Sequence, residues 1–155
     1  MAEQRAAVIA IGNPLRSDDG VGPAVLKRLR GRVPAGVRLS EIHGEPSALF
    51  EAWAGLDTAI VIDAVVTGQT PGTVHVLDAS AGPLAARTAI ASTHGLGLAE
   101  ALELGRALHR LPARIVVVGI EAGQTDTAEG LTAPVLGALD AAASQVIAQL
   151  GGGDA

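Results

Sequence analysis

Apolar runs alternate along the chain with stretches in which apolar residues recur every three or four positions. The runs predict strands and the helical spacing predicts amphipathic helices. The expected strands are 6–11, 37–42, 58–66, 72–77 and 114–120, and the expected helices are 20–30, 46–53, 96–108 and 133–150. The runs at 58–66 and 114–120 are rich in Val and Ile, which is typical of strands covered on both faces.

The order of these elements predicts an α/β fold. Strands and helices alternate as in βαβ units, except that only residues 67–71 separate two of the strands. This connection is too short for a helical crossover, so we expect strands 58–66 and 72–77 to form an antiparallel pair. The prediction is a three-layer α/β/α sandwich of the phosphorylase/hydrolase-like kind, with a five-stranded, mostly parallel sheet and one antiparallel strand. The length of 155 residues suits a single domain over 1–155, with its core at about 6–150.

Composition narrows the function classes. The chain has no cysteine, which excludes disulfides, thiolate nucleophiles and cysteine metal ligands and fits a reducing compartment. A net charge of −5 without a basic stripe argues against nucleic-acid binding. No apolar run approaches the ~18 residues of a membrane span. We therefore expect a soluble, cytoplasmic protein without a nucleic-acid or membrane partner. The G-x-G-x-x-G, G-x-S-x-G and H-E-x-x-H motifs are absent as well.

Acidic residues and a histidine, which can bind a metal or take part in catalysis, interrupt the apolar pattern at three places. Asp18 and Asp19 lie at a strand-to-helix turn, Asp63 breaks the apolar run 58–66, and His94 precedes an expected helix. Carboxyl ends of parallel strands gather ligand-binding groups. A buried carboxylate must be hydrogen-bonded, paired, neutral or metal-bound. One carboxylate of the Asp18-Asp19 pair, together with Asp63 and His94, therefore forms a candidate metal site, whose oxygen and nitrogen ligands suit nickel, zinc or cadmium equally.

Ordinary structural roles remain open for each of these residues. Adjacent Asp residues at a turn are typical helix caps. Asp63 can bond loop amides, and a single loop histidine is often only a surface residue. His75 and His109 are expected at the surface, and Glu121 is expected to support the site from the end of its strand.

A set of motifs spread over the chain resembles the hydrogenase maturation endopeptidases. The motifs are Gly12-Asn13-Pro14-Leu15, Asp18-Asp19-Gly20-x-Gly22, Asp63-Ala64, Pro71-Gly72-Thr73 and Ser92-Thr93-His94-Gly95-Leu96-Gly97-Leu98. Their order and spacing extend the resemblance over about 8–150. These enzymes remove a short C-terminal tail from the large subunit of nickel–iron hydrogenases.

The resemblance implies specific roles for the candidate residues. The precursor of the large subunit already carries nickel when it is cut, and Asp19, Asp63 and His94 would contact that nickel, with zinc or cadmium as surrogates. The same three residues are the candidate catalytic groups. Either the bound cation would polarise the carbonyl or activate a water, or a free carboxylate would serve as general base, and the sequence leaves both open. Asp18 would be a helix cap or a supporting group. We expect a monomeric peptidase. A non-cleaving metal- or peptide-binding accessory protein, or a small-molecule hydrolase or phosphorylase on a similar scaffold, are the alternatives.

The loop at 43–45 departs from the family pattern. Several family members have a Gly-Gly turn here that is thought to help select the substrate, whereas this chain has His43-Gly44-Glu45. The loop would sense the partner if it faces the cleft.

Overall fold

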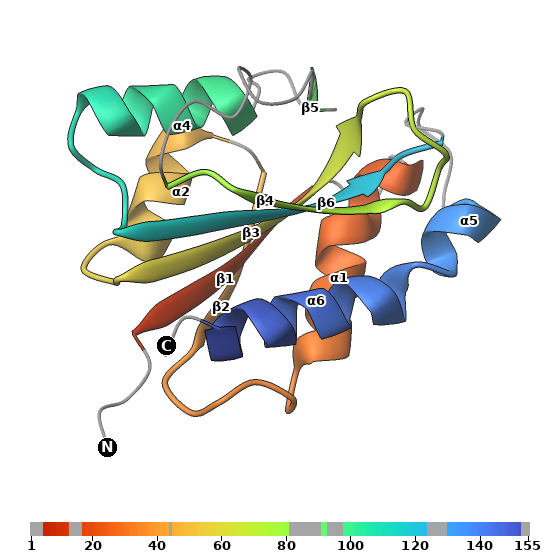
Figure 1. Ribbon diagram of the computed structural model, residues 1–155, viewed down its shortest axis with the longest axis horizontal. Helices are drawn as coiled ribbons and strands as arrows, with labels where there is room; N and C mark the ends of the chain where they lie inside the picture. Colours follow the sequence, from red (N-terminus) through yellow and green to blue (C-terminus); the bar gives the residue numbers. More distant parts are fainter. Residues whose placement is uncertain are drawn as a thin grey trace.

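A mixed β-sheet forms the middle layer of the protein, between two layers of helices (Figure 1). The computed structural model describes residues 5–12, 17–43, 45–80, 91–92, 98–123 and 130–152. Its strands are β1 (Ala6–Ile11), β2 (Arg38–Ile42), β3 (Thr58–Val66), β4 (Val74–Asp78), β5 (Ala91–Ser92) and β6 (Arg114–Glu121).

The strand order is β2-β1-β3-β6-β4, and the short β5 pairs with β3 beside this path. The first four of these strands are parallel neighbours, and β4 is antiparallel to β6. Along this path the expected five-stranded, mostly parallel sheet with one antiparallel strand is confirmed, and the two-residue β5 is a further, antiparallel strand. The expected β3–β4 pair is wrong, because β6 lies between the two. β3 and β6 are both apolar and almost fully buried, whereas β4 is only partly buried, as suits an edge strand.

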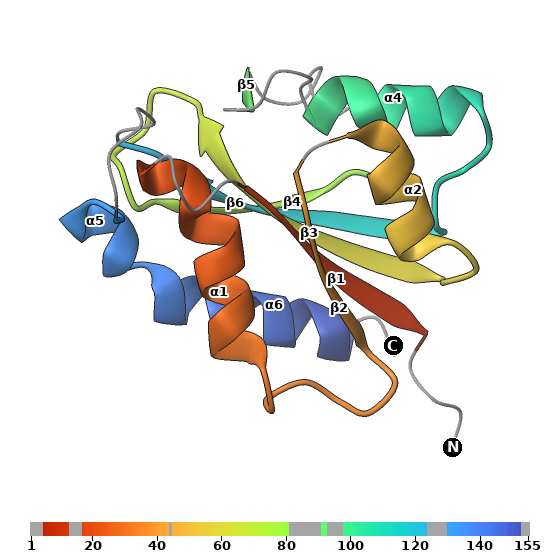
Figure 2. The same cartoon turned by 180° about the vertical axis from the view of Figure 1, so that it is seen from behind.

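Helices cover both faces of the sheet (Figures 1 and 2). One face carries α1 (Val21–Leu29), α5 (Ala133–Leu136) and α6 (Leu139–Gly152), and the other carries α2 (Pro46–Trp53) and α4 (Leu98–Ala107). A 3₁₀ turn, η1 (Ser17–Gly20), precedes α1. We expected one helix at 133–150, but the structure has two, α5 and α6, which are separated at Gly137. Glycine is unfavourable inside a helix, which explains the break. In the part of the chain that the structure describes, no helix is long and apolar enough to cross a membrane.

The core consists of two apolar clusters, one on each face of the sheet. Ile60, Ile62 and Ala64 of β3 belong to the cluster under α1 and α6, whereas Ala59 and Val61 belong to the cluster under α2 and α4. Successive side chains of a strand point to opposite faces. Asp63 therefore lies on the α2/α4 face, in the row of Ala59 and Val61.

Candidate functional site

Asp63 is fully buried near the carboxyl end of the central strand β3. The pairing of β1 with β3 ends at Ala10 and Ile62, one residue before Asp63. On its other side Asp63 is paired in register with Gly119 of β6. A carboxylate is thus held at the edge of the sheet where α/β proteins bind their ligands. The sequence-based prediction that Asp63 is buried at this edge is confirmed.

Gly22 brings the turn that contains Asp19 against this edge. A Cβ on Gly22 would lie 2.6 Å from the carbonyl oxygen of Ile11 and 3.0 Å from that of Ile62. Only a residue without a Cβ fits there, so α1 starts in direct contact with the ends of β1 and β3. Asp19 lies in η1, three residues before Gly22. The position of its side chain is outside the part of the structure that is described.

β5 brings a third segment to the same edge. Ser92 is paired with Val65, and Ala91 with Val66, in antiparallel register. α4 begins at Leu98, which packs in the cluster on the α2/α4 face, the face that carries Asp63. His94 itself lies outside the described residues, two positions after Ser92. The predicted meeting of Asp19, Asp63 and His94 therefore stays a prediction.

Asp18 has a structural role, but it does not cap α1. The N-cap of that helix is Gly20, with no side-chain hydrogen bond to the helix. Asp18 is fully buried, and its carboxylate accepts hydrogen bonds from the backbone N–H of Gly123 at 2.8 Å and of Thr132 at 2.7 Å. The Thr132 hydroxyl donates to it at 2.8 Å as well. Asp18 thus fastens η1 to the end of β6 and the start of α5.

Glu121 ends β6 and ties two segments to the sheet. Its carboxylate accepts hydrogen bonds from the backbone N–H of Thr67 at 2.8 Å and from the Thr67 hydroxyl at 2.6 Å, and it lies 3.1 Å from Nε2 of His75. Burial raises the pKa of Glu121, but the Thr67 hydrogen bonds and His75 outweigh it and hold the pKa below its ordinary 4.5. Glu121 therefore stabilises this edge of the sheet, and its support of the candidate site stays a prediction.

His75 was expected at the surface, and this expectation is wrong. Its side chain is 19% exposed and is bonded to Glu121. The register explains the contact, because β4 pairs with β6 and places His75 opposite Gly119, which is itself opposite Asp63. The contact between His75 and Glu121 depends on the pairing of β4 with β6, which the length of the loop before β4 does not predict. His109 follows α4 and is exposed, as expected.

The loop after β2 also reaches the carboxyl edge. Nδ1 of His43 lies 3.2 Å from the carbonyl oxygen of Gly12, the residue after β1. Glu45 is exposed and is the N-cap of α2, although its side chain does not bond to the helix. His43 therefore contacts the residue that directly follows β1.

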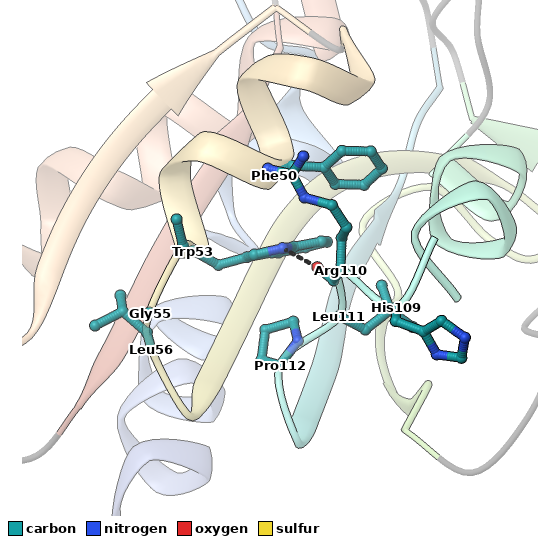
Figure 3. A pocket seen from close by; sticks show the side chains of 9 residues that line it. Phe50, Trp53, Gly55, Leu56, His109, Arg110, Leu111 and Pro112 are labelled. Atoms are coloured by element: carbon teal, nitrogen blue, oxygen red, sulfur yellow. Dashed lines mark hydrogen bonds between the residues drawn. The ribbon is translucent and has the colours of Figure 1, made fainter. Parts of the chain in front are cut away.

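A pocket of about 240 Å³ lies at the opposite edge of the sheet (Figure 3). Phe50, Trp53, Leu56, Arg110 and Pro112 line it, just before β3 and β6 begin. Trp53 Nε1 donates a hydrogen bond of 2.7 Å to the carbonyl oxygen of Arg110, whose guanidinium lies 5.5 Å from the centre of the Phe50 ring. The pocket is far along β3 from Asp63 and takes no part in the candidate site.

The described residues contain only part of the candidate metal site. Within these, no group of three or more His, Asp or Glu side chains could hold a metal ion. The side chain of Asp19 and the whole of His94 lie outside these residues. The described part of the candidate site is therefore the buried carboxyl group of Asp63 at the end of β3, while Asp18 and Glu121 hold neighbouring segments of the chain in place.

Comparison with known proteins identifies the family. The family model for hydrogenase maturation protease matches residues 44–149, a range that includes Asp63 and His94. The hydrogenase 2 maturation protease of Escherichia coli (strain K12) is 30% identical over 149 residues, which cover 94% of this chain and 90% of the relative. This chain belongs to the hydrogenase maturation proteases. The resemblance inferred from the sequence is confirmed.

Solved structures agree with this family assignment. The solution structure of an endopeptidase from Escherichia coli matches with a TM-score of 0.81 and 29% identity, over 95% of this chain and 92% of that one. The [NiFe] hydrogenase maturation protease HybD from Thermococcus kodakarensis matches with a TM-score of 0.76 and 27% identity, over 92% and 97% of the two chains. This chain thus has the same α/β fold as these relatives and, like them, is a peptidase.

Proposed function

We propose that this maturation protease is an endopeptidase that removes the C-terminal tail of a nickel–iron hydrogenase large-subunit precursor after nickel insertion. The observation that carries the proposal is the position of Asp63. A fully buried carboxylate lies at the carboxyl end of the central strand, in a chain of this protease family. Burying a carboxylate among Val and Ile costs stability, so a functional role accounts for its presence.

We further propose that Asp19, Asp63 and His94 contact the nickel that the precursor carries. Three features support this set. Gly22 permits the turn containing Asp19 to pack against the residue before Asp63. Ser92, two positions before His94, pairs with Val65, two positions after Asp63. Two carboxylates and an imidazole leave coordination positions open for ligands from the precursor.

The roles of these groups follow from their chemistry. A cation next to the scissile peptide polarises its carbonyl and lowers the pKa of a bound water towards ~7. Asp63 orients that cation through a carboxylate that the strand holds rigidly, and His94 contributes a neutral nitrogen. The chain has no cysteine, so its own ligands hold a soft metal weakly, and the precursor supplies the missing affinity.

The test compares two forms of one precursor. Candidate large-subunit precursors are purified with and without nickel and incubated with the protease. Tail removal is followed by gel shift and by the mass of the released peptide. Cleavage of the nickel-loaded form alone is expected, and nickel added to the protease alone should not replace loading of the precursor.

His94→Ala separates nickel recognition from other contacts. The variant should capture the nickel-loaded precursor less well in a pull-down, and its contact with the nickel-free form should stay almost unchanged. Equal cleavage of both forms by the wild type would refute nickel recognition and indicate an ordinary hydrolase. Capture of the loaded precursor without any shortening would indicate an accessory protein that binds but does not cut.

A further inference from the structure

A groove of about 300 Å³ opens between α1 and the segment that carries α5 and α6. It begins at Gly20, the last residue of η1, and runs along one side of α1. Figure 2 shows α1 beside α5 and α6 on the face of the sheet away from α2 and α4. The residues that line it include Gly20, Pro23, Ala24, Lys27, Leu131 and Leu139.

The walls of the groove are apolar. Pro23 and Ala24 come from α1, and Leu131 and Leu139 come from the opposite side. Leu139 is only 4% exposed and belongs to the core, so the floor is firmly packed. Such a recess fits an aliphatic side chain of an extended peptide.

The far end of the groove is basic. Lys27 is exposed there and is the only lysine in the 155 residues. The neighbouring Arg28 is held in an ion pair by Asp140. In a chain with a net charge of −5, a lysine beside an apolar recess favours a carboxylate over other polar groups.

The near end of the groove lies next to Asp19 in the chain, whereas Asp63 is on the other face of the sheet. Gly20 directly follows Asp19, and Leu131 directly precedes Thr132, which Asp18 holds through two hydrogen bonds. From Gly20 to Lys27 the chain advances seven positions, mostly in α1, which is about 10 Å. An extended peptide covers that distance in about three residues.

We infer that this groove is a specificity subsite for the precursor chain beside the scissile bond. It accepts an aliphatic side chain between Pro23 and Leu131 and a carboxylate at Lys27, about three residues from the bond that is cut. The inference rests on the proposed function, since it takes the site next to Asp19 as the place of cleavage. The Asp18 contacts keep the two walls at a fixed distance.

The first test is a kinetic comparison with the nickel-loaded precursor. Lys27→Glu should raise KM about tenfold with kcat changed less than about twofold, since one charge contact made equally before and during reaction is lost. Lys27→Arg should stay within about threefold of the wild type. Arg30→Glu is the matched control, because it makes the same charge change at an exposed residue at the end of α1, and its KM should stay within about twofold.

The second test uses the single lysine. A zero-length carbodiimide activates a carboxylate, the Lys27 amine attacks it to form an amide, and the urea leaves. Mass spectrometry of the cross-linked complex should find Lys27 joined to an Asp or Glu about three residues from the cleavage point. Changing that acid to Lys in the precursor should restore the KM of Lys27→Glu.

The outcomes separate this inference from the proposed function. A wild type that removes the tail, together with an unchanged KM for Lys27→Glu, overturns the subsite and leaves the proposed function standing. Cross-links confined to the N-terminal amine overturn the subsite as well. A wild type that never removes the tail overturns the proposed function, and the subsite with it.

Discussion

The carbonyl oxygen of Ile62 lies 3.0 Å from the position that a Cβ on Gly22 would occupy. Ile62 precedes the buried Asp63, and Gly22 follows the turn that contains Asp19. The absence of a single side chain thus allows two parts of the candidate site to approach each other. Glycine is required at position 22 because a Cβ there would clash with backbone carbonyl oxygens of two strands, which cannot move aside. Turn flexibility is not the reason.

Gly22→Ala should damage both stability and processing. The added methyl would lie 2.6 Å from the Ile11 carbonyl oxygen, so α1 and η1 must move away from the sheet. We expect a loss of about 1–3 kcal/mol in the free energy of unfolding, as for other overpacked sites. Tail removal should fall further than stability explains. Urea unfolding and a precursor gel shift on the same preparation measure both effects.

Gly151→Ala is the matched control for that change. Gly151 lies in α6, and nothing is within 4 Å of the place of its Cβ. Alanine favours helices over glycine, so stability should be unchanged or higher by about 0.5–1 kcal/mol. Equal effects of the two substitutions would show that the close approach at Gly22 has no special importance.

Asp18→Asn should destabilise the fold through the link between η1 and α5. The buried carboxylate accepts hydrogen bonds from Gly123 and Thr132, and an amide retains only one acceptor oxygen. Hydrogen bonds to a charged group contribute about 1.5–3 kcal/mol, and a loss of this order is expected in urea unfolding. The control is Asp140→Asn, which breaks the exposed ion pair with Arg28 and should cost no more than about 1 kcal/mol. Similar losses for both variants would contradict the assigned role of Asp18.

The lowered pKa of Glu121 should make the stability of the protein depend on pH. Its pKa is lowered in the folded protein, so the unfolded state binds the proton more readily. The stabilisation is complete above the ordinary pKa of 4.5 and is lost as the pH falls through the lower, folded pKa. Glu121→Gln should therefore be less stable than the wild type at pH 7, and the difference should shrink on acidification below about pH 4.5. Urea unfolding at several pH values measures it, and a constant difference from pH 7 to pH 3 argues against this role.

Much of the fold could be predicted because the strongest apolar patterns are local. The strands Ala6–Ile11 and Thr58–Val66 and the helix Pro46–Trp53 lie where the sequence placed them. The neighbour of β4 could not be read from loop length, since pairing depends on which buried strand needs a partner across the whole sheet. The two-residue strand Ala91–Ser92 is too short to leave a pattern.

The candidate site likewise has one feature that the local sequence predicts and others that depend on the folded structure. The burial of Asp63 could be predicted because this residue lies within the apolar run 58–66. The contacts of Asp18 with Gly123 and Thr132 join residues more than a hundred positions apart, and nothing near Asp18 in the sequence announces them. His75 was misplaced for the same reason, because its contact with Glu121 depends on the β4–β6 register.

The most direct test of the account is tail removal by Asp63→Asn. The substitution is nearly isosteric, so the variant should stay folded in thermal unfolding and leave the nickel-loaded precursor uncut. Val61→Ala, in the same strand and on the same face, should lose about 1–3 kcal/mol of stability and still cut the precursor. A folded Asp63→Asn protein that removes the tail at the wild-type rate would contradict the central claim that Asp63 acts on the substrate.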